Sequence, residues 1–290
     1  MNKKSAASLE RAGDFVWRNA RLIERALFAH LFVEASAPAV IAALMAYQNA
    51  DGGFGNALEA DVRTPSSMPV ACEAAMITLH QAAIRDPSIA TALCDYLASV
   101  AEPDGRVPIV TKEIFDYPRA SHWSASLFGG DSPNPTAGLV GLLQYQEIRH
   151  QWLSRAADWC WRRLENPLHD AHEIATALRF LQHAPDRQRA REIASRIARE
   201  AEKTSLFQIH PDRSRYGLTP LHLCPRPDSI AAEAFSENVF SEHLDELTAL
   251  QQDDGGWPIK WEAPGPGAEI EWRGRVTLDA LITLRAYGRI

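Results

Sequence analysis

The sequence predicts an all-α fold in which helical hairpins close into a ring. Apolar residues recur at the helical spacing i, i+3, i+4 along most of the chain, and no segment alternates convincingly like a strand. The turn sequence Gln-x-x-Asp-Gly-Gly-aromatic occurs at residues 48–54 and again at 251–257. A helical hairpin cannot bury its apolar face alone, and a repeat at both ends of the chain favours closure over an open array. With 290 residues, of which 46% are hydrophobic, we expect one domain over 1–290.

Helical periodicity defines the elements in order. The expected helical segments are 22–31, 40–47, 68–79, 87–97, 135–143, 152–164, 170–181, 193–197, 230–250 and 276–287. Ser66 or Ser67 can cap the third segment, and Asp170 can cap the seventh. Allowing for shorter pieces, this gives about ten to twelve helices. Long connections rich in Gly, Pro, Asp or aromatic residues follow Tyr47, Asp104, Phe207 and Asp253, and we expect them to gather on one face.

The repeated turn has a clear physical basis. Its Gly pair supplies a positive φ and ends the preceding helix, while its Asp accepts hydrogen bonds from backbone amides within the turn. A degenerate third copy lies at 101–108. The motif therefore predicts where helices end and hairpins stack.

These turns resemble the QW-type motifs of squalene–hopene and oxidosqualene cyclases, and the Gly-Gly-Phe turns of protein prenyltransferase β subunits. The resemblance implies a single α/α toroid, with an inner and an outer ring of helices around a central cavity. The loops 56–67 and 112–134 also look like an uncharacterised small bacterial branch of this superfamily. The implied function is an enzyme that acts by acid catalysis on a small, mostly apolar ligand, for example an isoprenoid.

Several chemistries of that superfamily lack their residues here. The Asp-x-Asp-Asp motif of the class II cyclases is absent from the sequence. Asp158, Cys160 and His222 imitate a prenyltransferase zinc set. However, positions i and i+2 of a helix point about 200° apart, so this set is not expected to bind metal. No P-loop, dinucleotide-binding or nucleophile-elbow motif is present. We therefore expect neither a metal nor a cofactor.

The net charge and the cysteines indicate which partners and which cellular location to expect. The net charge of −7 does not suit a nucleic-acid partner. The N-terminal residues lack the apolar core of a signal peptide, and no uncharged apolar stretch is long enough to span a membrane. Four widely spaced cysteines suit buried, reduced thiols. We expect a cytoplasmic protein and leave its oligomeric state open.

The catalytic candidates lie in the loop after the first repeated turn. Glu59, Asp61 and Arg63 alternate there, so an extended backbone would direct all three to one side. Two carboxyl groups near an arginine can supply a proton donor and an anchored anion. His122, in the second long loop, is the fourth catalytic candidate. The alternative is a structural ion pair that ties the loop to a helix end.

Candidates for ligand binding combine aromatic rings with a few polar groups, as ligand pockets do. They are Asp116, Tyr117, Trp123 and Asn134 in the second long loop, His169 and Glu173 at a helix start, and Trp257, Glu271, Trp272 and Arg273 in or after the last loop. Self-packing of the loops, and capping of a helix by Glu173, are the alternatives.

Two further functions fit the same residues. A carbohydrate-processing toroid would place two carboxyl groups on either side of a sugar. A non-catalytic binding scaffold would hold the acids in ion pairs. The expected partner is a small molecule in the central cavity.

Overall fold

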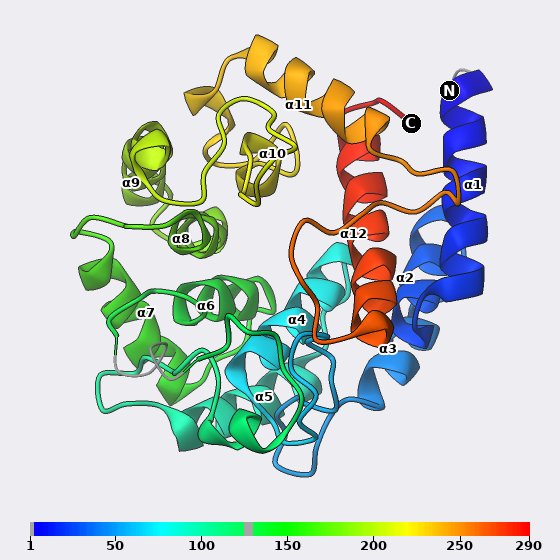
Figure 1. Ribbon diagram of the computed structural model, residues 1–290. Helices are drawn as coiled ribbons and strands as arrows, with labels where there is room; N and C mark the ends of the chain where they lie inside the picture. Colours follow the sequence, from blue (N-terminus) through cyan, green and yellow to red (C-terminus); the bar gives the residue numbers. More distant parts are fainter. Residues whose placement is uncertain (1–2, 125–129) are drawn as a thin grey trace.

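The computed structural model describes residues 3–124 and 130–290, and it is helical throughout (Figure 1). Over these residues no strand forms, and β-type pairing is limited to isolated bridges. The all-α prediction is thus confirmed. Among the same residues, no helix is both long enough and apolar enough to cross a membrane.

The α-helices that the described residues form are α1 (Lys3–Asn19), α2 (Leu22–Phe32), α3 (Ala37–Met45), α4 (Pro69–Gln81), α5 (Pro87–Val100), α6 (Thr136–Tyr145), α7 (Gln151–Arg163), α8 (Ala171–His183), α9 (Arg187–Glu200), α10 (Pro220–Leu223), α11 (Glu237–Ala249) and α12 (Pro266–Ala286). Short 3-10 helices lie at Lys112–Asp116, Ala201–Lys203 and Ala232–Ala234.

The helices alternate between two positions along the chain. In Figure 1, α4, α6, α8, α10 and α12 lie nearer the centre, while α1, α5, α7, α9 and α11 lie toward the periphery. Consecutive inner helices α4, α6 and α8 pack on one another, and the first helix packs on the last, α1 on α12. The chain ends meet as well, because Ser5 Oγ donates a hydrogen bond of 2.8 Å to the carbonyl of Arg289.

The repeated turn has the same geometry at 48–54 and at 251–257. Asp51 accepts from the N–H of Gly53 at 2.9 Å, and Asp254 accepts from the N–H of Gly256 at 3.0 Å. The motif glutamine reaches across each turn and donates to a glycine carbonyl. The degenerate copy folds alike, with Asp104 accepting from the N–H of Arg106 at 3.2 Å.

Each copy of the turn is tied to the inner helix that follows it. The N–H of the last motif residue donates to a side chain of the next inner helix. The pairs are Phe54 to Cys72 on α4, Val107 to Thr136 on α6, and Trp257 to Thr277 on α12.

The central glycine of each turn has a positive φ and lies too close to a peripheral helix for any side chain. Gly52 meets Ala92 of α5, Gly105 meets Ala156 of α7, and Gly255 meets Arg11 of α1. The last turn therefore docks on the first helix in the way that the earlier turns dock on α5 and α7.

Helix α9 begins six residues before the expected segment 193–197, and the short helix α10 was not expected. Three differences from expectation are larger. Helix α1 was not expected at all, although it buries Phe15 and Val16. Helix α12 begins at Pro266, ten residues before the expected start, because Pro266 occupies the first helical turn, where its missing N–H costs nothing. The expected segment 230–250 divides at Ser236, whose side chain caps α11 by accepting from the N–H of Val239.

The buried apolar side chains form one continuous cluster that includes residues from α1 to α12. All four cysteines are free and buried, and burial raises the pKa of the Cys160 thiol. Within the described part of the chain, no three His, Cys, Asp or Glu residues are arranged to hold a metal ion.

Candidate functional site

The site is built on two loops whose backbones pair. The N–H of Arg63 donates to the carbonyl of Pro118 at 3.0 Å, and the N–H of Ala120 donates to the carbonyl of Asp61 at 2.9 Å. The loop carrying Glu59 and Asp61 is thereby held against the loop carrying His122.

Arg21, between α1 and α2, holds the start of the first loop. Its guanidinium binds both carboxylate oxygens of Glu24, at 2.5 and 3.0 Å, and donates to the carbonyls of Ala57 and Leu58. A charged group with five donors in a rigid fork can fix several acceptors at once. Arg21 therefore sets the backbone position from which Glu59 projects.

Asp61 is a buried carboxylate with defined partners. Its Oδ1 accepts a hydrogen bond of 2.7 Å from Trp272 Nε1, and its Oδ2 lies 3.5 Å from His122 Nε2. The Asp61 side chain is only 4% exposed, whereas that of His122 is 51% exposed. Burial raises the pKa of Asp61, and the bond from Trp272 opposes that shift. Burial also lowers the pKa of His122, which the charge of Asp61 opposes.

Glu59 differs from Asp61 because its carboxyl group makes no hydrogen bond or ion pair with any residue that the structure describes. Its side chain is half-buried. Burial, and next the negative charge of Asp61, raise the pKa of Glu59 from 4.5 to about 8. Glu59 is thus protonated at neutral pH, as a general acid must be before it acts.

Arg63 is directed to the last helix. It binds Glu271 of α12 through two nitrogens, at 2.5 and 3.2 Å. This bidentate pair ties the loop to the beginning of α12, one residue before Trp272. Arg63 and Glu271 therefore position the contact between Trp272 and Asp61.

Aromatic rings continue from Trp272 across the site. Trp272 meets Trp261 edge to face at 5.0 Å between ring centroids, and Trp261 meets Tyr216 in the same way at 5.7 Å. Trp261 also acts on Asp61, because the N–H of its buried indole nitrogen favours the charged carboxylate and lowers the pKa of Asp61. The hydroxyl of Tyr216 lies 2.8 Å from Nε2 of His172 on α8.

Charged side chains on the inner helices extend the site. Glu73 of α4 pairs with Arg179 of α8, and Gly138 of α6 leaves the room for this pair, since a Cβ there would overlap both side chains. Arg275 and Asp279 pair along α12 at 3.2 Å. The charges of Arg275 and Glu73 both act on Glu59.

Several predicted ligand-binding residues lie in other places. The Glu173 carboxylate accepts from the backbone N–H of His169 at 2.8 Å, which leaves the His169 side chain exposed. Trp257 is buried and donates to the carbonyl of Leu247. Arg273 binds Asp254 and Gln252 in the last turn. These residues hold helix ends and turns together.

The predicted residues of the second long loop differ in how deeply they are buried. Trp123 is buried beside His122, with its ring 5.1 Å from the imidazole. Asp116 and Tyr117 are exposed. Asn134 is half-buried and precedes the cis-proline Pro135, at the start of α6.

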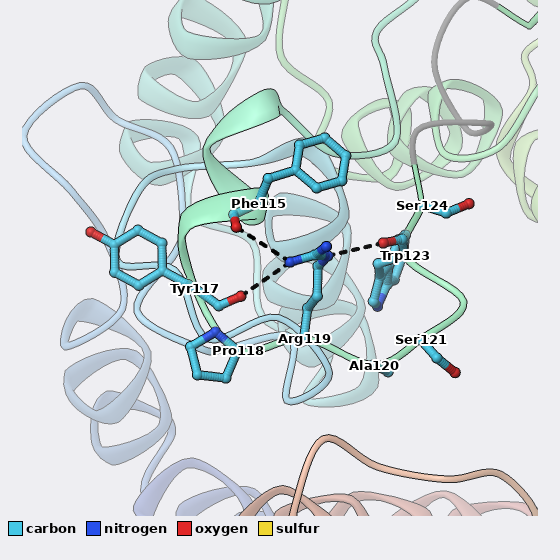
Figure 2. A pocket seen from close by; sticks show the side chains of 8 residues that line it. All are labelled: Phe115, Tyr117, Pro118, Arg119, Ala120, Ser121, Trp123 and Ser124. Atoms are coloured by element: carbon cyan, nitrogen blue, oxygen red, sulfur yellow. Dashed lines mark hydrogen bonds between the residues drawn. The ribbon is translucent and has the colours of Figure 1, made fainter.

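A cleft of about 440 Å³ lies on this loop, next to the site (Figure 2). Arg119 occupies its middle and donates to the carbonyls of Phe115, Tyr117 and Trp123. Its lining includes no carboxyl group. The cleft is therefore separate from the acids at Glu59 and Asp61.

Four contributing residues were not found from the sequence: Arg21, Glu73, His172 and Tyr216. They come from four separate segments. Trp261, by contrast, stands in the aromatic last loop, whose tryptophans the sequence marks as candidates for holding a ligand.

The arrangement can transfer protons to and from a polar ligand. It combines a protonated carboxyl group, a fixed carboxylate, two imidazoles, a phenol and partly exposed indole rings. The surrounding arginines and carboxylates give it hydrogen-bonding capacity in several directions.

No protein-family model and no curated protein matches the sequence. Among solved structures, the chain is similar to a protein from Actinoplanes, with a TM-score of 0.56 and 17% sequence identity. The match covers 96% of this chain and 99% of the other. At that identity the similarity concerns the fold alone.

Proposed function

We propose that the protein is an α/α-toroid enzyme that cleaves a glycosidic bond in a hydroxyl-rich ligand, with Glu59 as the general acid. The observation that carries this proposal is the half-buried carboxyl group of Glu59, which pairs with no residue that the structure describes. Burial and the charge of Asp61 raise its pKa to about 8. In glycoside hydrolysis, a protonated carboxyl group gives its proton to the leaving oxygen as a positively charged sugar forms. The carboxylate of Asp61 would stabilise that charge.

The toroid is supported by the repeated turn. Each copy joins a peripheral helix to the next inner helix and docks on another peripheral helix, and the last copy docks on α1. The packing of α1 on α12 agrees with a closed ring.

The ligand class follows from the residues around Glu59. An isoprenoid would call for apolar walls, whereas Glu73, Arg179 and Arg275 are charged, and the two arginines are partly exposed. Charged groups beside aromatic faces suit a sugar, whose hydroxyls need hydrogen bonds and whose C–H face packs on rings. An acid-catalysed reaction of an isoprenoid remains the second candidate, supported by the three tryptophans Trp123, Trp261 and Trp272.

The test compares Glu59→Gln with the wild type on two kinds of glycoside. Unactivated oligosaccharides, followed by release of reducing sugar, need a proton on the leaving oxygen. A 2,4-dinitrophenyl glycoside does not, because its leaving group is stable as an anion. We expect Glu59→Gln to lose about 10²- to 10⁴-fold in kcat/KM on the oligosaccharide and little on the dinitrophenyl glycoside. Wild-type activity should hold up to pH 8 and fall above it, where Glu59 loses its proton.

Glu10→Gln, which changes an exposed carboxyl group on α1, is the matched control and should match the wild type. Equal loss on both glycosides would show that Glu59 is not the acid. Turnover of geranyl or farnesyl diphosphate, with none of any glycoside, would favour the isoprenoid function instead.

A further inference from the structure

Tyr216 lies at a fixed point of the long loop between α9 and α10. The N–H of Gln208 donates to the carbonyl of Leu218 at 2.9 Å, and the N–H of Leu218 donates to the carbonyl of Leu206 at 2.7 Å. The buried side chain of Gln208 also donates to the carbonyl of Arg215 at 3.0 Å. These bonds on both sides of Tyr216 fix the direction of its ring.

His172 connects Tyr216 to a carboxylate. Its Nε2 lies 2.8 Å from the hydroxyl of Tyr216, and its Nδ1 lies 3.3 Å from Oδ1 of Asp170. Asp170 is itself fixed as the N-cap of α8, where it accepts from two backbone N–H groups. A carboxylate beside Nδ1 favours the tautomer with the proton there, which leaves Nε2 free to accept the proton of the phenol.

The phenol belongs to the same site as the acid. The ring of Tyr216 meets Trp261, which meets Trp272, which donates to Asp61. The charge of Asp61 acts on the phenol. Burial, followed by the charges of Asp170 and Asp61, raises the pKa of Tyr216 to about 12, so the hydroxyl keeps its proton unless a base removes it.

The proposed cleavage needs a base, and neither carboxyl group supplies one. Glu59 is protonated, and Asp61 is buried with its Oδ1 bonded to Trp272. A hydroxyl paired with an imidazole can accept a proton from water while giving its own proton to the ring.

We propose that Tyr216, acting with His172, is the base that activates the attacking water, an inference that rests on the proposed function. Water gives one proton to the oxygen of Tyr216 as the phenol proton passes to Nε2 of His172, and the hydroxide forms the new bond to the sugar carbon. The old bond to the leaving oxygen breaks as Glu59 gives that oxygen its proton. The positive charge on His172 is balanced by Asp170, and its proton then returns through solvent to Glu59.

The test uses the two glycosides introduced above. A base is needed whatever the leaving group, so Tyr216→Phe should lose about 10²- to 10⁴-fold in kcat/KM on both substrates, unlike Glu59→Gln. His172→Gln keeps a polar group but cannot take the proton. It should show a similar loss on both substrates.

Tyr287→Phe is the matched control, because it removes another half-buried tyrosine hydroxyl, bonded to the carbonyl of Cys224. It should keep wild-type activity, and thermal unfolding should show that both Phe variants fold. If Tyr216→Phe keeps full activity while Glu59→Gln loses it on the oligosaccharide, the base is another group and the proposed function stands. If the wild type cleaves neither glycoside, the proposed function fails, and this inference fails with it.

Discussion

In the folded protein, Glu59 keeps its proton at pH values at which the unfolded chain has already lost it. Its pKa is raised from 4.5 to about 8, so the folded state binds a proton that the unfolded chain has already released above pH 5. Stability is therefore greatest below pH 4.5 as far as this group is concerned, and it decreases as the pH rises through 8. The raised pKa that suits Glu59 to acid catalysis therefore lowers the stability of the folded protein above pH 4.5.

That cost predicts a stabilising variant. Glu59→Gln removes the titrating group, so its free energy of unfolding should exceed that of the wild type by about 2 to 4 kcal/mol at pH 8. At pH 4 the two proteins should be nearly equally stable. Urea unfolding at both pH values measures the difference. An advantage of the same size at pH 4 would show that packing rather than ionisation is responsible.

At the residue scale, the sequence was informative where functional groups cluster along the chain. Glu59, Asp61 and Arg63 stand in one short loop after a recognisable turn, and the structure brings Arg63 and Asp61 to Glu271 and Trp272. Tyr216 and His172 meet only because α8 and a distant loop pack together. No local sequence pattern predicts such a pair, because the two residues come together only in the tertiary structure.

At the scale of the element, copies of the repeated turn follow the ends of α3, α5 and α11. Its central glycine has both a positive φ and a backbone neighbour at the position where a Cβ would lie, as at Gly52 against Ala92. Either condition alone restricts the position, and together they require glycine.

We therefore expect Gly52→Ala to destabilise the fold by at least about 2 kcal/mol. Gly267→Ala is its control, because Gly267 lies in the first turn of α12, where a Cβ would meet nothing within 4 Å. That change should be neutral or stabilising by up to about 1 kcal/mol. Chemical denaturation of both variants gives the comparison, and equal effects would remove the special role of the turn.

Most elements were predictable from periodicity, and the exceptions have physical reasons. Pro266 and Gly267 are typical of loops, so the sequence predicted a later start for α12. Proline is nevertheless well suited to the first turn of a helix. Helix α1 carries many charged residues, and its apolar residues Phe15 and Val16 are buried only because distant segments pack against them.

At the scale of the whole molecule, the last repeated turn packs against the first helix. Gln251 binds Ser8 through its side chain at 2.6 Å and Arg11 at 2.8 Å, and Gly256 lies against the ring of Phe15. These contacts join the last repeated turn to the first helix.

Two rearranged chains test this interdependence. A circular permutant that joins residue 290 to residue 3 by a short Gly-Ser linker and opens the chain after Glu147, in the loop between α6 and α7, keeps every such contact. It should unfold within a few degrees of the wild type by circular dichroism. A chain that begins at Arg21 lacks α1 and should unfold at a much lower temperature. A truncated chain as stable as the wild type would contradict this reading.

The bond between Ser8 and Gln251 also has a consequence for how the protein is made. The two residues are 243 positions apart, so at about 5 to 20 residues per second the first helix waits about 12 to 50 seconds for its partner during translation. Throughout that time Phe15 and Val16 have nothing from the last turn to cover them. Until Gln251 has been made, the nascent chain therefore exposes the apolar face of the first helix, the kind of surface that chaperones bind.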